Sequence, residues 1–135
     1  MNFKDAKYKA SLNIEIKTYE IDIAGHVNNI VYVKWLEDLR CKLFEQILSI
    51  DNLLYWNLYP VVTSTNIVYK KQLKLSDKPV GSIWIENIQH NMMILKFDFL
   101  LENKIIAFAE QKCVLLNLKN GTMDKQRLKS LAGVE

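Results

Sequence analysis

Polar and apolar side chains alternate without a break over residues 11–17, Ser-Leu-Asn-Ile-Glu-Ile-Lys. This period of two is typical of a β-strand that buries one face, so we predict the first strand there. Beyond the polar loop that follows, apolar residues recur at spacings of three and four, which predicts a long helix buried on more than one side. The repeating positions are Val33, Leu36, Leu39, Leu43 and Ile47, with Tyr32, Trp35 and Phe44 widening the apolar stripe.

No glycine or proline interrupts this helical pattern before Asp51, so the helix is expected to continue until there. The side chain of Asn28 or Asn29 would cap its first turn, because an amide oxygen can accept from a backbone N–H that has no partner inside the helix. Trp56, Tyr55 and Tyr59 follow the helix closely. They could line a ligand pocket, although aromatic residues at a helix end more often pack in the core.

From Pro60 onward, β-branched and aromatic runs are separated by short polar breaks, which predicts an antiparallel meander. His90-Asn91 and Glu102-Asn103-Lys104 have the residue types of tight turns, and Asn120-Gly121 ends the last strand. Lys125 to Leu131 would add a short terminal helix. The four predicted strands run from Val61 to Lys70, from Val80 to Gln89, from Met92 to Leu101 and from Ile105 to Leu116.

The chain of 135 residues is 50% hydrophobic and offers no place to divide it, so residues 1–135 are expected to form a single α+β domain. A domain of this size gains stability by burying surface against another subunit, which makes an oligomer plausible. The sequence contains no apolar stretch of the roughly 18 residues that a membrane span needs, and it does not begin like a signal peptide. We therefore expect a cytoplasmic protein without a membrane partner.

The formal net charge of +3 is too small to indicate nucleic-acid binding, but the positive charge is concentrated in two segments. Residues 69–78, which we name the first basic segment, hold four lysines and one aspartate. The second basic segment, residues 119–129, holds Lys119, Lys125, Arg127 and Lys129 with Asp124. Two cationic patches suit a phosphorylated ligand, and solvated loop lysines are an equally good interpretation of either patch alone.

The two cysteines, Cys41 and Cys113, lie far apart in apolar segments and have no C-x-x-C spacing. The spacing gives no support for a metal site, and we expect both thiols to be buried as small hydrophobic groups. Cys41 is a poor candidate for a nucleophile, because it falls in the middle of the predicted helix, whereas activated thiols favour helix N-termini.

The richest chemistry lies in the run Asp22-Ile23-Ala24-Gly25-His26-Val27-Asn28-Asn29, followed by Tyr32. It brings a carboxylate, an imidazole and two amides just before a helix, where backbone N–H groups are free and the helix dipole favours negative charge. These groups suit acyl transfer. Each also has a purely structural interpretation, since aspartate and asparagine satisfy turn donors, glycine allows tight turns and a lone histidine is usually structural.

This run, D-x-x-G-H-V-N-N-x-x-Y, resembles the signature of the hotdog-fold acyl thioesterases, the 4-hydroxybenzoyl-CoA thioesterase family and its acyl-carrier-protein relatives. The resemblance implies an antiparallel sheet of about five strands wrapped around one long central helix. It also implies hydrolysis of an acyl-CoA thioester, with coenzyme A present only as part of the substrate and no other cofactor or metal. Members join two sheets edge to edge with the active sites between subunits, so a homodimer or a tetramer is implied.

By this resemblance, Asp22 is the general base or nucleophile, and His26 orients that carboxylate or the substrate. The backbone N–H of Asn29 would point at the thioester oxygen as an oxyanion donor, a contact typically worth about 3 kcal/mol in the transition state. Gly25 and Asn28 would shape this substrate-binding loop. One departure is Ala24, where the acyl-carrier-protein thioesterases have an asparagine.

The resemblance further implies that the neighbourhood of Tyr69, Lys70 and Lys71 holds the nucleotide or the pantetheine arm of coenzyme A. Many members have an arginine-proline pair here, whereas this chain has Lys71-Gln72. Lysine binds phosphate as a point charge, without the planar, two-bond geometry of an arginine guanidinium.

Two alternatives remain open, namely an acyl-carrier-protein thioesterase and a non-catalytic acyl-CoA binding module. A hotdog dehydratase is disfavoured because the sequence has no H-F-P motif.

Overall fold

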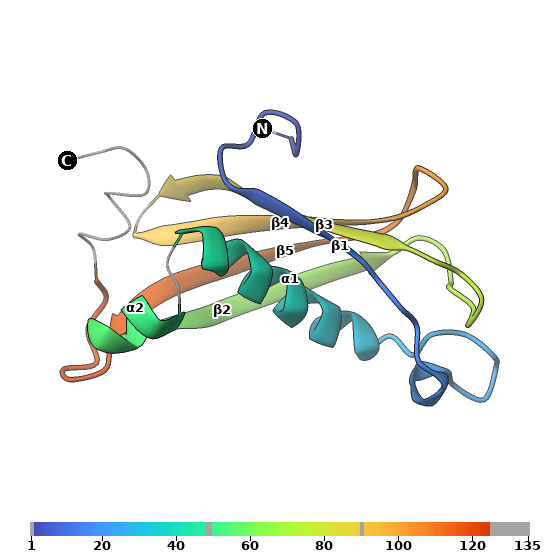
Figure 1. Cartoon of the computed structure of the whole chain (residues 1–135), viewed down its shortest axis with the longest axis horizontal. Helices are drawn as coiled ribbons and strands as arrows, with labels where there is room; N and C mark the ends of the chain where they lie inside the picture. Colours follow the sequence, from blue (N-terminus) through green and yellow to red (C-terminus); the bar gives the residue numbers. More distant parts are fainter. Residues whose placement is uncertain (1, 48–49, 90, 125–135) are drawn as a thin grey trace.

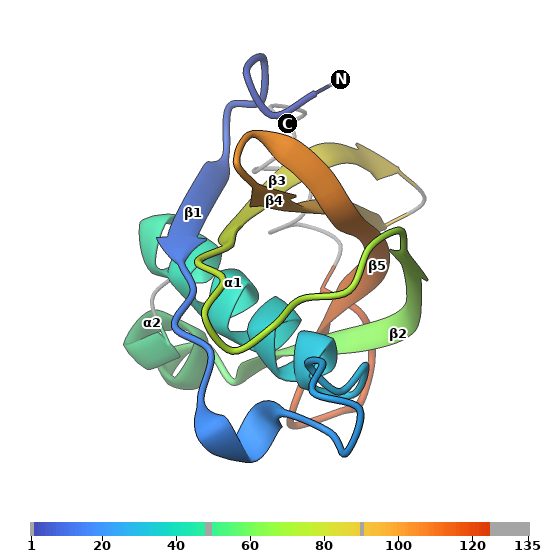
Figure 2. The ribbon, with the colours of Figure 1, turned by 90° about the vertical axis from the view of Figure 1, so that its right-hand side faces the viewer.

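An antiparallel sheet curves around one long helix (Figures 1 and 2). The computed structural model describes residues 2–47, 50–89 and 91–124. The sheet has five strands in the order β1-β3-β4-β5-β2, which is the α+β hotdog arrangement that the resemblance implies. The elements in chain order are β1 (Lys9–Asn13), the 3₁₀ helix η1 (Thr18–Glu20), α1 (Val31–Ile47), α2 (Ile50–Tyr55), β2 (Leu58–Tyr69), β3 (Val80–Gln89), β4 (Met92–Leu101) and β5 (Lys104–Asn117).

The meander agrees closely with the sequence prediction. The predicted bounds of β3 and β4 are confirmed, while β2 and β5 differ from theirs by one to three residues at each end. Glu102 and Asn103 have φ of 51° and 66°, as in the two-residue turns that connect hairpin strands. Gly121, with φ of 69°, turns the chain just after β5. His90 and the predicted helix from Lys125 to Leu131 lie outside the described residues.

The first predicted strand is wrong in its position, because β1 pairs with β3 only from Lys9 to Asn13. The next amide, that of Ile14, donates to the Pro79 carbonyl at 3.0 Å, and the chain then leaves the sheet. Ile14 and Ile16 nevertheless pack against the core. The alternation of polar and apolar residues therefore continues beyond β1, because the Ile14 and Ile16 side chains still pack on the core while their neighbours face away from it.

The helix that the sequence predicts as far as Asp51 corresponds to α1, described to Ile47, and to α2, described from Ile50, and residues 48–49 between them lie outside the described residues. α2 lies against β2, with the Leu53 side chain only 4% exposed. The C-terminal part of the helical region therefore covers the beginning of β2.

The core forms where α1 lies on the concave face of the sheet. Leu36, Leu39 and Leu43 on α1 are fully buried, as are Leu95 and Phe99 on β4. Since the buried side chains recur every three or four residues, one face of the helix supplies this contact.

The strands nearest to α1 are β1 and β3. α1 approaches β3 tightly at Gly81, where an added Cβ would lie 2.9 Å from Leu39 Cδ1 and 3.0 Å from Ile14 Cδ1. Glycine at this position lets the helix pack directly on the backbone of β3.

No helix in the described part of the chain combines the length and apolar character that a membrane span requires.

Replacing Gly81 with valine tests this close approach. We expect the Gly81→Val variant to lose about 1–3 kcal/mol of unfolding free energy, because the added atoms overpack a filled core. Urea denaturation followed by circular dichroism measures the loss. Asn87→Val is the matched control, since Asn87 is an exposed position of the same strand. Equal stability of the two variants would contradict the packing described for α1 and β3.

Candidate functional site

The run from Asp22 to His26 forms the tip of a small hairpin between η1 and α1. Ile21 and Val27 pair in an antiparallel bridge, and the Asp22 amide donates to the His26 carbonyl at 2.8 Å. The Gly25 amide donates to the Asp22 carbonyl at 3.0 Å, and Gly25 has φ of 84°. A positive φ is costly for most residues with a Cβ, so glycine at position 25 allows the turn without strain.

The Asp22 carboxylate is exposed and is oriented by this turn. Its Oδ1 accepts the backbone N–H groups of Ala24 at 3.0 Å and His26 at 3.1 Å. Within the described residues Oδ2 has no hydrogen-bond partner. Asp22 therefore stabilises the turn, as the structural interpretation expects, and still offers one oxygen for chemistry.

His26 is half-buried, and its contacts to Asp22 come from the backbone. Among the described residues, the imidazole makes no hydrogen bond to the carboxylate. The His26 N–H helps to orient Asp22, while the ring is left for other contacts.

The start of α1 is capped by Asn28. Its Oδ1 accepts the Ile30 amide at 3.2 Å, and its carbonyl accepts the Val31 amide at 2.9 Å. The N–H of Asn29 belongs to the same peptide as this carbonyl and points the opposite way, because a trans peptide holds the two groups antiparallel. It is thus directed away from the helix, and it has no acceptor in the described part of the chain.

The Asn29 carbonyl joins the beginning of α1 to the end of β2. It accepts the Tyr32 amide at 3.3 Å and the Tyr69 hydroxyl at 3.0 Å. The Tyr32 and Tyr69 rings meet edge to face with centroids 5.1 Å apart, and Phe99 contacts Tyr32 in the same manner at 5.2 Å. Burial, with a smaller contribution from Tyr69, raises the pKa of Tyr32 to about 12. Tyr32 is therefore neutral at physiological pH and packs the helix start.

Glu20 is a site residue that the sequence did not reveal. Although charged, it is only 4% exposed. Its Oε1 accepts the Lys17 amide at 2.7 Å, its Oε2 lies 3.7 Å from Lys34 Nζ, and its carbonyl accepts the Asn28 amide at 2.9 Å. Glu20 thereby holds η1 and the base of the hairpin together. Its carboxylate bonds back to the Lys17 amide three residues earlier, as the glutamate of a capping box does, but a lysine at the first position is not part of the Ser/Thr-x-x-Glu signature, so the sequence offered no signal for it.

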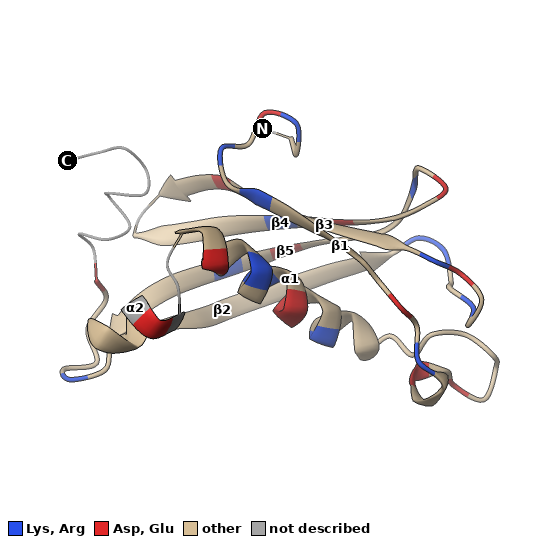
Figure 3. Cartoon of the chain, in the orientation of Figure 1, with Lys and Arg blue, Asp and Glu red and all other residues tan. Residues whose placement is uncertain are grey.

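The first basic segment lies at the same end of the sheet as the hairpin. The backbone amides of Lys70 and Lys71 both donate to the Ile106 carbonyl, at 2.9 and 3.0 Å, and both side chains are exposed. The Val27 amide donates to the Leu73 carbonyl at 2.8 Å, which ties this segment to the hairpin. Figure 3 shows the basic residues that follow β2.

The second basic segment does not join this site. Lys119 follows the C-terminal end of β5, whereas the first basic segment follows the C-terminal end of β2. Because β2 and β5 are antiparallel, these two points lie at opposite ends of the sheet. The remaining cations of the second segment lie outside the described residues.

The cysteines differ from the expectation in one respect. Cys113 is buried, as expected, whereas Cys41 is exposed on α1, so its predicted burial is wrong. The helix turns Cys41 away from the face that packs on the sheet. Partial burial and the Glu37 carboxylate raise the pKa of the Cys41 thiol, which opposes a nucleophilic role. The described residues hold no cluster of side chains suited to a metal ion.

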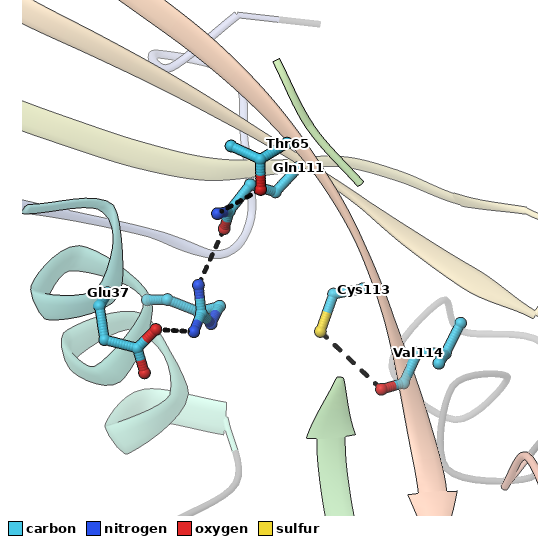
Figure 4. Close-up of polar contacts among 6 residues, drawn as sticks. Glu37, Thr65, Gln111, Cys113 and Val114 are labelled. Atoms are coloured by element: carbon cyan, nitrogen blue, oxygen red, sulfur yellow. Dashed lines mark hydrogen bonds and ion pairs between the residues drawn. The ribbon is translucent and has the colours of Figure 1, made fainter. Parts of the chain in front are cut away.

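A partly buried chain of polar side chains links α1 to the sheet (Figure 4). Arg40 Nη1 donates to Gln111 Oε1 at 2.9 Å, and Gln111 Nε2 donates to Thr65 Oγ1 at 3.1 Å. The other end of the guanidinium pairs with Glu37. The sequence alone does not reveal this network, because its partners are up to 71 positions apart.

The aromatic residues after α1 divide between two roles. Tyr59 is 53% exposed and lines a groove beside α2. Trp56 packs against the core instead, and Tyr55 is largely exposed at the end of α2.

Comparisons with known proteins agree with this fold. The model of the thioesterase-like superfamily matches residues 16–131. The long-chain acyl-CoA thioesterase FadM of Escherichia coli is 29% identical over 108 residues, which cover 78% of this chain and 82% of FadM.

Two solved structures share the fold at lower sequence identity. The DHNA-CoA thioesterase from Staphylococcus aureus has a TM-score of 0.79 and 18% identity, with 90% of this chain and 82% of that one covered. Protein SAV2348 from Staphylococcus aureus, solved in complex with CoA, has a TM-score of 0.77 and 14% identity, with 87% and 74% covered. Because the family model spans most of the sequence, this chain belongs to the thioesterase-like superfamily.

Proposed function

We propose that this protein hydrolyses acyl-CoA thioesters to a free acid and coenzyme A. The observation that carries the proposal is the outward-pointing Asn29 amide at the start of α1, close to a carboxylate with one free oxygen. Membership of the superfamily and similarity to a long-chain acyl-CoA thioesterase support it. A CoA complex among the proteins of the same fold supports the choice of carrier.

The Asn29 amide stabilises the negative charge that develops on the thioester oxygen. Its direction is preset, because the Asn28 carbonyl of the same peptide is already bonded to the Val31 amide. A preset donor needs no reorganisation during the reaction, and the dipole of α1 adds to its effect. Such a donor typically contributes about 3 kcal/mol to the transition state.

Asp22 supplies the base. The Ile21–Val27 bridge and the bond from the Asn28 amide to the Glu20 carbonyl tie the turn that carries Asp22 to the peptide that carries the Asn29 N–H. Asp22 Oδ2 takes a proton from water as the water oxygen bonds to the carbonyl carbon, or attacks that carbon itself to form an anhydride that water then opens.

In either route the carbon–sulfur bond breaks, and the sulfur leaves as the thiolate of coenzyme A and then takes a proton.

His26, half-buried beside the turn, is assigned to contact the substrate. Gly25 and Asn28 keep the loop and the helix cap in shape. The chemistry needs neither a metal nor a cofactor, because thioesters are reactive enough for one placed base and one oxyanion donor.

Lys70 and Lys71 are assigned to the phosphates of coenzyme A, with Tyr69 holding the helix start. Both lysine side chains are exposed at the hairpin end of the sheet.

We further propose a homodimer, or a tetramer built from such dimers. β2 is at the end of the strand order, so one of its edges has no partner strand within the described chain, and such an edge favours pairing with a second subunit.

An Asp22→Asn variant tests the base directly. Asparagine keeps an oxygen that can accept the Ala24 and His26 amides, so the turn is retained while the charge is removed. We expect kcat for acyl-CoA hydrolysis to fall by about 10²–10⁴-fold. Release of the CoA thiol from a panel of short, long and aromatic acyl-CoA substrates measures the effect.

Asp77→Asn is the matched control, because Asp77 also accepts a backbone amide, that of Lys74 at 2.8 Å, from an exposed loop. The control should retain wild-type turnover. Unchanged turnover in Asp22→Asn would remove Asp22 from the mechanism. Binding without turnover by the wild-type protein would favour an acyl-CoA binding module, and turnover restricted to acyl-carrier substrates would favour the acyl-carrier-protein alternative.

The double variant Lys70→Ala/Lys71→Ala tests the CoA assignment. We expect KM for acyl-CoA to rise about tenfold, the equivalent of about 1.4 kcal/mol, with little change in kcat. Acyl-pantetheine, which lacks the nucleotide phosphates, should be hydrolysed equally by variant and wild type. Lys119→Ala, at the other end of the sheet, is the control. An equal loss for both substrates would contradict phosphate binding by these lysines.

A further inference from the structure

The two exposed sides of α1 differ in character. On the side toward β1 the exposed residues are charged, namely Lys34, Asp38 and Lys42. On the side toward β2 the exposed residues recur at helical spacing and are mostly apolar, namely Ile30, Val33, Glu37 and Cys41. We name these four residues the α1 stripe. Glu37, its one charged member, is already paired with Arg40.

The α1 stripe belongs to a longer row of exposed apolar side chains beside β2. Near the start of α1, Ile30 is 73% exposed and Val33 is 51% exposed. Near the start of β2, Leu54 of α2 is 60% exposed and Tyr59 is 53% exposed. Single exposed apolar residues are ordinary, whereas a row of them beside an open strand edge indicates an interface between proteins.

The open edge itself is long. β1 and β2 form the two edges of the sheet (Figure 2). β1 has five residues, whereas β2 has twelve, and its outer edge has no partner strand within the described chain. An edge of this length favours addition of another strand.

A second copy of this chain matches this face from end to end. The face is apolar at both ends and polar in its middle, where the four β2 residues Thr63–Asn66 are all exposed. A two-fold axis through this middle pairs the two β2 edges antiparallel and places the apolar end of one subunit on the opposite apolar end of the other. The pairing buries no unpaired charge of the α1 stripe, because Glu37 keeps Arg40. We therefore take a second copy as the occupant.

Antiparallel pairing brings the start of one β2 beside the end of the other. The end of β2 belongs to the proposed thioester site, because the Tyr69 hydroxyl donates to the Asn29 carbonyl at 3.0 Å. Tyr59 precedes Tyr69 by ten residues, or about 33 Å at 3.3 Å per residue of strand. Tyr59 is therefore too far away to reach the site of its own subunit.

We propose that the partner subunit's Tyr59 forms one wall of the thioester site and contacts the acyl group beside the thioester. This inference rests on the proposed function and adds to it the residue that the second subunit supplies. A tyrosine ring offers a large apolar surface, and its hydroxyl can remain at the wet rim of the site. A single subunit lacks this wall, so the site is complete only in the dimer.

Tyr59→Ala removes the proposed wall. We expect kcat/KM for acyl-CoA hydrolysis to fall about tenfold, because the acyl group loses apolar contact. Phe108→Ala is the matched control. Phe108 is 41% exposed, and it lies on the face of the sheet away from α1, since its neighbours Ala107 and Ala109 are buried on the other face. The control should keep the wild-type value, and equal values for the two variants would overturn the inference alone.

Mixed dimers separate a role in the partner's site from a role in the subunit's own site. Asp22→Asn and Tyr59→Ala subunits carry different affinity tags and are co-expressed, and the heterodimer is purified through both tags. If Tyr59 acts across the interface, one of the two sites holds both Asp22 and Tyr59, and the heterodimer should reach about half of the wild-type kcat/KM.

Two results with the mixed dimers would overturn the inference. If Tyr59 acts within its own subunit, neither site is intact, and the heterodimer should be no more active than the Tyr59→Ala dimer. Wild-type subunits with the same two tags are the control for pairing, and their failure to copurify would show that no dimer exists.

Cross-linking tests the same geometry without turnover. In a Cys41→Ser background, where Cys113 is buried, Ile30→Cys subunits are mixed with Tyr59→Cys subunits and treated with a short bismaleimide. We expect a covalent dimer, because the two ends of the face meet across the interface. Phe108→Cys in place of Tyr59→Cys is the control, and equal cross-linking of both pairs would overturn the inference. Cross-linking by a protein that hydrolyses no acyl-CoA would overturn the proposed function and the role of Tyr59 together.

Discussion

The peptide between Asn28 and Asn29 is the constraint on which the site depends. Its carbonyl accepts the Val31 amide, and this bond directs the Asn29 N–H away from α1. The next carbonyl along, that of Asn29, is held by the Tyr69 hydroxyl from β2. An oxyanion donor is useful only if its direction is set before the substrate arrives. The helix cap and the end of β2 together fix the direction of the proposed donor.

The hairpin that carries Asp22 is attached to the same peptide. The Asn28 amide donates to the carbonyl of the buried Glu20, and Val27 bonds to the Leu73 backbone in the first basic segment. One connected set of backbone hydrogen bonds thus positions the proposed base, the proposed oxyanion donor and the segment that carries the lysines. Loops that carry function are ordinarily mobile, and here the anchoring bonds come from elements on both sides of the loop.

The close packing of α1 on Gly81 fixes which side of the helix faces β1 and β3, because an added Cβ there would lie 2.9 Å from Leu39 Cδ1. A second contact holds the helix toward β5 and β2. Arg40 donates to Gln111, which in turn donates to Thr65, and the same guanidinium pairs with Glu37 (Figure 4).

Local patterns predicted the meander and the helix well, because turn residues such as Glu102-Asn103 act through their own backbone angles. The first strand was misplaced because alternation reports burial on one side, which Ile14 and Ile16 keep after leaving the sheet. Exposure of Cys41 depends on how α1 is rotated against the sheet. The separation of the two basic segments depends on strand order, a long-range property that spacing along the chain does not contain.

The most direct measurement is the release of CoA thiol by the purified wild-type protein, with matched acyl-CoA and acyl-carrier-protein substrates compared side by side. We expect multiple turnovers on acyl-CoA, at a rate equal to or greater than that on the carrier protein. A folded protein that binds acyl-CoA and releases no thiol would contradict the proposed hydrolysis.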